Sequence, residues 1–353
     1  KFDDFYSPKL KNLLPEPFLF KDLEKGVKRL ADEIEQNRPV GIFGDYDVDG
    51  ATSAAMISSY LEYCGLKTFI HIPDRFLEGY GPNEKALKGL HLKGAELIIT
   101  VDCGISSFEP LKAMSSVDID LIVIDHHIPD AVLPPAYAII NPKRLDTCKG
   151  YENLCAAGVS FIFLIGLNRE LRQRGFFNQI KEPDLRNFLD LVALGTVCDV
   201  VPLNGLNRAF VKQGLSIMKK REHPGIKALC DVSKLSNVPN TQALGFSLGP
   251  RINAGGRIGA SELGVLLLKE TDINKSIEYA NKLDDLNKKR RFITAELERS
   301  VIGQIEKLIS NNNNLTPSAI VVYSNDYHEG VIGIIAGRMK EIYNRPVCII
   351  SLD

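Results

Sequence analysis

VGIFGDYDVDG, residues 40–50, joins a short apolar run to three acidic residues at alternate positions, Asp45, Asp47 and Asp49. The apolar run predicts a buried β-strand, and the following residues 51–64 have helical character. One aspartate in such a turn would only cap the helix and stabilise its dipole. Three carboxylates within five residues repel one another, so they favour a bound cation over a solvated turn.

Calcium is the first cation to consider, because the order D-x-D-x-D-G also begins an EF-hand loop. An EF-hand needs a bidentate glutamate at the twelfth position of the loop, where this chain has Met56. It also needs a helix before the loop, whereas here a strand leads into it. The carboxylates therefore favour a different kind of metal site.

Composition describes an ordinary globular protein of two or three segments, with 353 residues, 44% hydrophobic and 25% charged. A net charge of -1 argues against nucleic-acid binding through bulk positive charge but leaves room for a local basic groove. The seven cysteines are far apart and form no C-x-x-C pair, as expected for reduced cytosolic thiols rather than disulfides or zinc ligands. With no signal peptide or membrane-spanning run recognisable, we expect a cytoplasmic protein without a membrane partner.

Short apolar strands alternate with helical patterns in the first part of the chain. The predicted strands are VGIF, TFIHI, LIITV and LIVI, with helices over 51–64 and near 83–91 and 107–115 between them. This alternation predicts an α/β fold with a parallel sheet.

The rest of the chain contains a helical region, a long helix and the start of a second domain. Mostly helical patterns run from about 153 to 220, and a turn-rich segment carrying LGPRINAGGRIG follows at about 222–270. Apolar residues at helical spacing, without proline or glycine before Gly303, predict one long helix over about 273–310. After it, SAIVVYS and EGVIGIIAGRMKEIY predict a strand and a helix of a second α/β domain, which we expect this chain to contain only in part.

Two more predicted strands also end in acids: LIITV runs into Asp102, and LIVI runs into Asp125, which His126 and His127 follow. The carboxyl ends of neighbouring parallel strands form one crevice, so these groups should gather there with the three acids of residues 45–49. A histidine pair alone would more often cap a helix and face solvent. Beside five carboxylates it favours metal binding instead.

Oxygen-rich sites with one or two imidazoles suit Mn²⁺ or Mg²⁺ better than zinc. So many acids exceed the needs of one ion. They predict two ions about 3.5–4 Å apart, the arrangement that hydrolyses phosphoesters by activating water.

The motifs GDYDVDG, VDCG and DHH, in this order, resemble those of the DHH phosphoesterases, and Asp199 in LVALGTVCDVVPL fits the fourth motif of that family. Four further segments resemble the RecJ branch of single-strand-specific exonucleases: IPDRFLEGYGPN (72–83), LCAAGVSF (154–161), LGPRINAGGRIG (248–259) and HEGVIGIIAGR (328–338). The resemblance spans nearly the whole chain. It implies a parallel-sheet DHH domain at 1–220, a connector with a long helix at 221–314 and the start of an incomplete DHHA1 domain at 315–353.

The same resemblance implies six metal ligands for two Mn²⁺ or Mg²⁺ ions: Asp45, Asp47, Asp49, Asp102, His126 and Asp199. Asp102 is the expected bridge between the ions. Whether Asp45 or Asp47 binds directly stays open, because Phe43 stands where relatives outside the exonuclease group carry a histidine. Asp125 would orient an imidazole rather than bind metal. His127 would face the scissile phosphate as a hydrogen-bond donor or a proton source.

Other side chains are candidates for contacts to the substrate. Arg251 and Arg257 flank what we expect to be a small-residue turn, and arginine pairs well with phosphate oxygens. Solvated arginines beside a structural turn are the alternative, and the resemblance favours Arg257 as a catalytic phosphate contact, with Arg251 second. His328 precedes a glycine-rich helix start, which attracts anions. Tyr80 and Phe76 could stack on bases or belong to a core.

The function implied by the resemblance is a Mn²⁺- or Mg²⁺-dependent exonuclease that degrades single-stranded DNA 5′→3′ to 5′-mononucleotides in recombination and repair. Its expected partners include a single-strand-binding protein or a helicase. One alternative is a DHH phosphodiesterase for short oligonucleotides or cyclic dinucleotides. The long connector argues against this alternative. The other is a catalytically inactive RecJ-like DNA-binding scaffold, against which the complete set of acidic and histidine ligand positions speaks.

Overall fold

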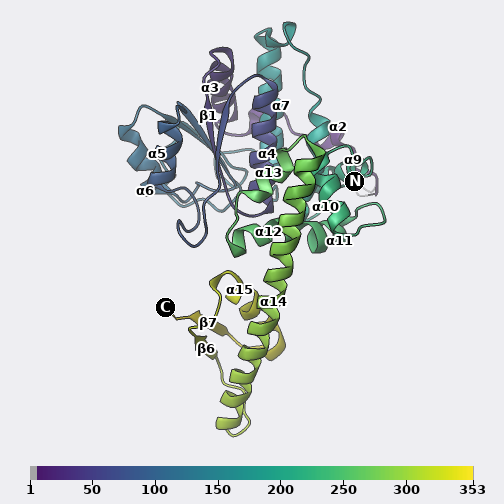
Figure 1. Cartoon of the computed structure of the whole chain (residues 1–353). Coiled ribbons are helices and arrows are strands. Elements are labelled where there is room, and N and C mark those ends of the chain that lie inside the picture. Colours follow the sequence, from purple (N-terminus) through teal and green to yellow (C-terminus); the bar gives the residue numbers. More distant parts are fainter. Residues whose placement is uncertain (1–5, 353) are drawn as a thin grey trace.

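The computed structural model describes residues 6–352 and shows two unequal parts joined by one helix (Figure 1). A large α/β body contains the N-terminal part of the chain. Helix α14 (Ile273–Asn311), 39 residues long, packs with its first half on this body and extends away from it. A second unit, made of residues 315–352, packs along the far half of α14. The predicted long helix is therefore confirmed.

A five-stranded parallel sheet in the order β2-β1-β3-β4-β5 forms the centre of the large body. Its strands are β1 (Val40–Gly44), β2 (Thr68–His71), β3 (Leu97–Val101), β4 (Asp120–Ile124) and β5 (Ala138–Ile140). The predicted parallel sheet is confirmed. In its register Gly44 lies opposite Val101, and Val101 lies opposite Ile124. The residues that follow each of these, Asp45, Asp102 and Asp125, therefore leave the sheet side by side.

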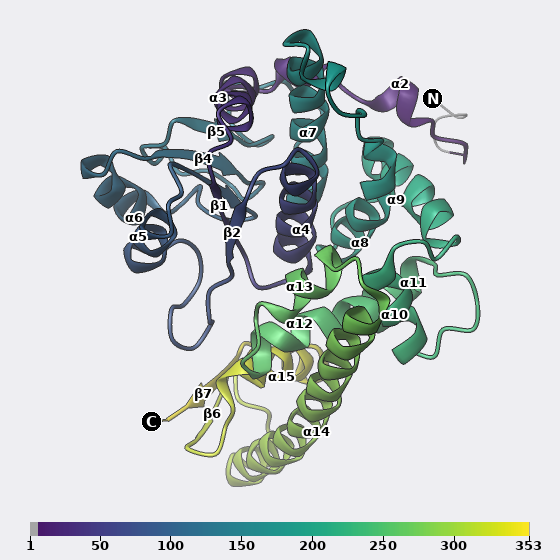
Figure 2. The same ribbon diagram turned by 45° about the horizontal axis from the view of Figure 1, so that its top comes forward.

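Helices cover both faces of this sheet, as Figure 2 shows. One face carries α3 (Leu23–Glu35), α4 (Val48–Tyr63) and α7 (Ala156–Gln173), and the other carries α5 (Glu84–Leu92) and α6 (Phe108–Ala113). Because both faces are covered, the strands are almost continuously apolar.

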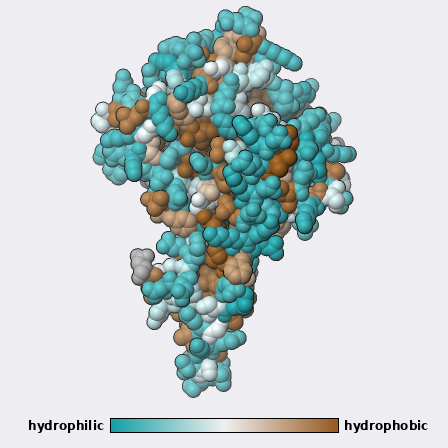
Figure 3. Space-filling view, in the orientation of Figure 1, coloured by the Kyte–Doolittle hydropathy of each residue, from teal (hydrophilic) through white to brown (hydrophobic). Residues whose placement is uncertain are grey.

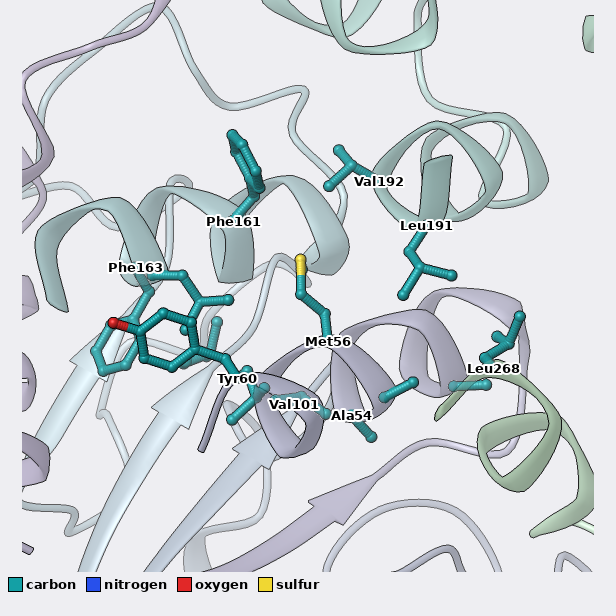
Figure 4. Close-up of a cluster of buried hydrophobic side chains, with 14 of the residues drawn as sticks. Ala54, Met56, Tyr60, Val101, Phe161, Phe163, Leu191, Val192 and Leu268 are labelled. Carbon is teal, nitrogen blue, oxygen red and sulfur yellow. The ribbon is translucent and has the colours of Figure 1, made fainter. Parts of the chain in front are cut away.

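Helix α4 lies in the middle of the large body and is buried on nearly every side. Its side chains Met56 and Tyr60 pack against Phe163 of α7, Leu191 of α8 (Leu189–Cys198) and the neighbouring core (Figure 4). A helix that starts with metal-ligand candidates and continues into the core gives those candidates a rigid support.

The remaining helices of the large body are α2 (Leu10–Leu13), α9 (Gly205–Met218), α10 (Pro224–Val232), α11 (Thr241–Ala243), α12 (Gly249–Ile258) and α13 (Leu263–Lys269), with short 3-10 turns at Pro17–Leu19, Met114–Ser116, Phe176–Asn178 and Leu185–Phe188. Residues from α10, α12, α13 and the start of α14 belong to the same core as the sheet. Thus much of the segment that the sequence analysis places in the connector packs with the large body.

The prediction of a turn at LGPRINAGGRIG was wrong, since these residues form α12 after a π-helical turn at Leu244–Leu248. Glycine normally disfavours a helix, but here it permits close packing. A Cβ at Gly256 would lie 2.9 Å from Cδ2 of Tyr46, and one at Gly249 would lie 2.4 Å from Sγ of Cys198. The glycines thus let α12 approach the segment that carries Asp45 and Asp47.

Gly195 of α8 allows a similarly close contact with α4, and Gly195→Ala is expected to destabilise the protein. A Cβ there would lie 2.7 Å from both Asp49 Oδ1 and Thr52 Oγ1. Overpacking of this kind costs about 1–3 kcal/mol, which exceeds the gain of up to about 1 kcal/mol in helix propensity. Denaturant unfolding should show a lower free energy of unfolding than for the wild type. Gly303→Ala in α14, where nothing lies within 4 Å of the new Cβ, is the control and should be neutral or stabilising.

The second unit contains β6 (Ile320–Ser324), α15 (Glu329–Tyr343) and β7 (Val347–Ser351), with the two strands paired in parallel. Strand β6 and helix α15 match the strand and the helix predicted for this part of the chain. Leu297, Val301 and Ile305 of α14 supply one side of its core. The unit also touches the large body, because Arg257 Nη1 donates to the carbonyl oxygen of Gly330 at 3.2 Å.

Hydrophilic residues dominate the face of the molecule shown in Figure 3. Within residues 6–352, no helix combines the length and the apolar character that crossing a bilayer requires.

Candidate metal centre

The acids that follow the strands lie close to Asp49 of α4 and to Asp199 at the end of α8. His126 Nε2 is 3.2 Å from Asp102 Oδ1, 3.7 Å from Asp199 Oδ2 and 3.8 Å from Asp49 Oδ2. Asp199 comes from the end of α8, far along the chain from the sheet. The structure thus brings all six predicted ligand residues into one cluster, which we call the metal centre.

Two groups of potential ligands adjoin each other within the metal centre. Asp45, Asp47 and Asp102 each offer a carboxylate oxygen, and these atoms lie within 4.8 Å of one another. Asp49, His126 and Asp199 form a second group by the same measure. Asp102 belongs to the first group and contacts His126 of the second, so the two groups meet at Asp102.

Unpartnered polar atoms point to what this cluster would bind. Asp45 Oδ1, Asp102 Oδ1 and His126 Nε2 are buried and make no well-formed hydrogen bond among residues 6–352, although the last two atoms lie 3.2 Å apart. A buried donor or acceptor without a partner costs free energy, whereas coordination to a cation would satisfy all three atoms. Carboxylate oxygens with one imidazole suit a hard or borderline divalent cation, so the residues fit Mn²⁺ or Mg²⁺.

The electrostatics of the cluster also favour a cation. Burial and the charge of Asp47 raise the pKa of Asp45 to about 7 and that of Asp199 to about 6. Burial, and then the charge of Asp49, raise the pKa of Asp102. The pKa of His126 falls to about 4, chiefly through burial, so its imidazole is neutral at pH 7 and can act as a ligand. A divalent cation would favour the ionised form of these carboxylates and would compete with protons for them.

Helix ends hold two of the acids in place. Asp49 accepts hydrogen bonds from the backbone N–H groups of Ala156 (2.6 Å) and Ala157 (2.9 Å) at the start of α7. This contact explains the LCAAGVSF segment, whose backbone amides face the carboxylate. Asp47 caps α4 by accepting from the N–H groups of Asp49 (2.9 Å) and Gly50 (3.1 Å).

Asp125 orients His127. Asp125 Oδ1 accepts from His127 Nδ1 at 2.7 Å and from the His126 N–H at 2.7 Å, and its Oδ2 accepts from the Ile105 N–H at 2.9 Å. Burial alone would raise the pKa of Asp125, but the hydrogen bond and the charge of His127, followed by the backbone N–H groups of Ile105 and His127, lower it. The bond to Asp125 is also the main cause of the raised pKa of His127. His127 is 45% exposed, so its other ring nitrogen is available beside Asp102 and His126.

Backbone strain accompanies two of the ligand candidates. Asp102 has φ 60°, and Val200, directly after Asp199, also has φ 60°. Left-handed backbone is rare for a β-branched residue such as valine and costs about 1–3 kcal/mol. Packing around the metal centre therefore holds both segments in conformations that they would not adopt alone.

Tyr80 lies at the rim of the metal centre. Its hydroxyl donates to the carbonyl oxygen of Asp102 at 3.4 Å, and its ring is 6.2 Å from that of His127 and 6.4 Å from that of Tyr46. It is 59% exposed, so it is not a core residue. Phe76 of the same loop packs edge-on against His328 of the second unit, with ring centroids 5.8 Å apart.

The basic candidates differ in how freely they can reach a ligand. Burial and the nearby Arg75 lower the pKa of Arg257, which lies close to Tyr46 and Asp47. The structure argues against Arg251 as a phosphate ligand, because its guanidinium pairs with Asp284 at 2.8 Å and donates to Ser247.

His328 also has a partner within the protein, and so does Lys288 in the basic run NKKRR at 287–291. The His328 ring accepts from the Gly330 N–H at 3.1 Å and so caps α15. In the basic run, Lys288 pairs with acids of its own helix. Arg75, which stacks over Tyr46 at 5.6 Å, was missed by the sequence analysis, although it lies within the quoted IPDRFLEGYGPN segment.

Comparison with known proteins places this geometry in a family. The model of the DHH family, N-terminal domain, matches residues 39–196. A crystal structure of exonuclease RecJ bound to manganese superposes with a TM-score of 0.82 at 30% sequence identity, over 96% of this chain and 81% of that one. The chain belongs to the RecJ branch of the DHH family.

Curated RecJ proteins agree with this placement. The single-stranded-DNA-specific exonuclease RecJ of Escherichia coli K12 is 39% identical over 330 residues, and that of Thermus thermophilus is 30% identical over 331 residues. The alignments cover 92% and 94% of this chain but 57% and 46% of those relatives, so the chain spans about half of their length. A crystal structure of the Thermus thermophilus RecJ with Mg²⁺ superposes with a TM-score of 0.71 at 27% identity, over 96% of this chain and 44% of that one.

Proposed function

We propose that this chain carries the catalytic part of a metal-dependent exonuclease that hydrolyses single-stranded DNA 5′→3′ to 5′-mononucleotides. The observation that carries the proposal is the pair of adjoining ligand groups that meet at Asp102, with His127 held beside them. The RecJ relatives support the choice of reaction and substrate, since they are named single-stranded-DNA-specific exonucleases and have been crystallised with Mn²⁺ and Mg²⁺.

Six residues would hold two divalent cations: Asp45, Asp47, Asp49, Asp102, His126 and Asp199. When bound, such ions supply an activated water and neutralise charge on the phosphate. Asp49 and Asp47, fixed by the starts of α7 and α4, keep their part of the ligand set from moving. Mn²⁺ and Mg²⁺ both fit this donor set.

The chain's own groups would position the substrate and move a proton. His127, oriented by Asp125, would donate a proton to the leaving oxygen. Arg257, half-buried next to Tyr46, would hold a phosphate oxygen of the strand. Tyr80 at the rim offers an exposed ring on which a base can stack.

The setting we propose is recombination and repair, where single strands are resected, with a single-strand-binding protein or a helicase as partner. This setting rests on the family alone.

The test is degradation of a long single strand labelled at its 5′ or its 3′ end, in Mn²⁺, in Mg²⁺ and in EDTA. We expect early release of a 5′-labelled mononucleotide with either metal and none in EDTA. Early release from the 3′ end would contradict the proposed polarity. Hydrolysis of dinucleotides without degradation of the long strand would instead identify a short-substrate phosphodiesterase, and binding without hydrolysis would identify a scaffold.

A further inference from the structure

A cavity of about 320 Å³ opens next to the metal centre, between the loops that follow β4 and β5. Ile128, which lines it, directly follows His127. The two loops are tied together at this point, because Asn141 Nδ2 donates to the carbonyl oxygen of His127 at 2.9 Å and Asn141 Oδ1 accepts from the Lys143 N–H at 2.7 Å. A molecule in this cavity would therefore lie beside the residue proposed to act on the scissile phosphate.

Apolar side chains stand at the mouth of this cavity. Ile128 is 79% exposed and Leu145 is 93% exposed, and Leu133 lines the same space. A single exposed apolar side chain needs no explanation, but two at the mouth of one cavity beside a catalytic cluster indicate a binding surface. Surfaces of this kind bury flat, weakly polar groups such as a base or a sugar.

Lys143 supplies an unpaired positive charge to the cavity. The other lining cation, Arg144, is fully engaged by Asp22, Asp146 and the Ile139 carbonyl oxygen. Among residues 6–352 the side chain of Lys143 makes no hydrogen bond or ion pair.

Two acids also line the cavity, Asp130 and Asp146, and Asp146 is paired with Arg144 at 2.8 Å. Because Arg144 and Asp146 neutralise each other, the ammonium of Lys143 is the cationic group left to bind a ligand that is charged at one end and apolar at the other. A nucleotide has this character, since its phosphate can pair with an ammonium while its base covers an apolar surface.

We propose that this cavity is a subsite for a nucleotide that flanks the scissile phosphate, with Lys143 on its phosphate and Ile128 and Leu145 against its base. The proposal rests on the proposed function for the identity of the strand. It assigns to Lys143 a role in binding the substrate rather than in the chemical step.

The test measures binding without turnover, by fluorescence anisotropy of a labelled single-stranded oligonucleotide in EDTA at several salt concentrations. Lys143→Met should weaken binding about tenfold or more, as expected for the loss of a hydrogen bond to a charged group. The slope of log affinity against log salt should fall by about 0.7, the contribution of one phosphate contact on a single strand. Lys143→Arg should restore most of the affinity. Lys149→Met is the matched control and should bind like the wild type, because the Lys149 ammonium lies outside the cavity and donates to the Arg144 carbonyl oxygen at 3.1 Å rather than pointing at a ligand.

Leu145→Ser provides a second variant that folding problems cannot confound, because this side chain is almost wholly exposed. It should weaken binding severalfold without changing the salt slope. Equal affinity and equal slope for Lys143→Met and Lys149→Met would overturn the subsite. Since these measurements need no hydrolysis, a wild type that binds as expected but degrades no DNA would contradict the proposed function and leave the subsite standing.

Discussion

Asp102→Asn is expected to lower kcat/KM for single-stranded DNA by more than about 10³-fold. Loss of a residue that only supports a metal ligand typically costs about 10–100-fold, and Asp102 stands where the two ligand groups meet. Asparagine keeps the shape of the side chain but removes the charge that would be shared by two cations. The release of 5′-labelled mononucleotide under single-turnover conditions measures the effect.

In the absence of metal, Asp102→Asn should leave the stability of the protein unchanged or increase it, although the same substitution lowers activity. Burial and neighbouring carboxylates raise the pKa of Asp102, so a neutral amide at this position relieves repulsion. The metal-free variant should therefore melt at the same temperature as the wild type or higher, while losing most of the increase in Tm that Mn²⁺ gives the wild type. Asp285→Asn on the exposed side of α14 is the control. Wild-type activity in Asp102→Asn would refute a shared ligand at this position.

The second large effect is expected for His127→Ala, which should reduce the single-turnover rate by about 10²–10⁴-fold, the range of general acid catalysis. Asp125→Asn should cost less, about 10–100-fold, because Asp125 would act on the substrate only through the imidazole that it orients. Calorimetric titration with Mn²⁺ should give the wild-type stoichiometry for both variants. Loss of one ion in His127→Ala would instead make His127 a ligand, which its position near Asp102 and His126 also permits.

The strand-end acids could be predicted from the sequence because the carboxyl ends of parallel strands lie at the same edge of a sheet. Asp45, Asp102 and Asp125 each follow a strand, and the register then places them side by side. Asp199 has no such local signal, since it ends a helix that reaches the site only through tertiary packing. Only the family resemblance indicated it before the structure did.

Contacts between distant segments account for what the sequence did not reveal. Arg251 looked free, but Asp284, 33 residues further along, pairs with it. The glycines of α12 looked like turn residues, because their purpose depends on Tyr46 and Cys198, which lie far from them in the chain. Lys143 lies in none of the motifs recognised in the sequence. Only the structure shows that its ammonium has no partner among residues 6–352 and faces a cavity.

Helix α14 restricts which insertions the protein can accept between its two parts. Its first half is fixed to the large body through Leu283 and Asp284, and its second half is fixed to the second unit through Val301 and Ile305. Each residue added between these anchors would turn the second unit by about 100° and shift it by about 1.5 Å. One extra residue would carry Gly330 around the axis and away from Arg257, whereas seven would restore the angle to within about 20° but add about 10 Å of separation. The number of residues in α14 thus sets the rotation of the second unit relative to the large body. An insertion of one residue would disturb this alignment more than its size suggests.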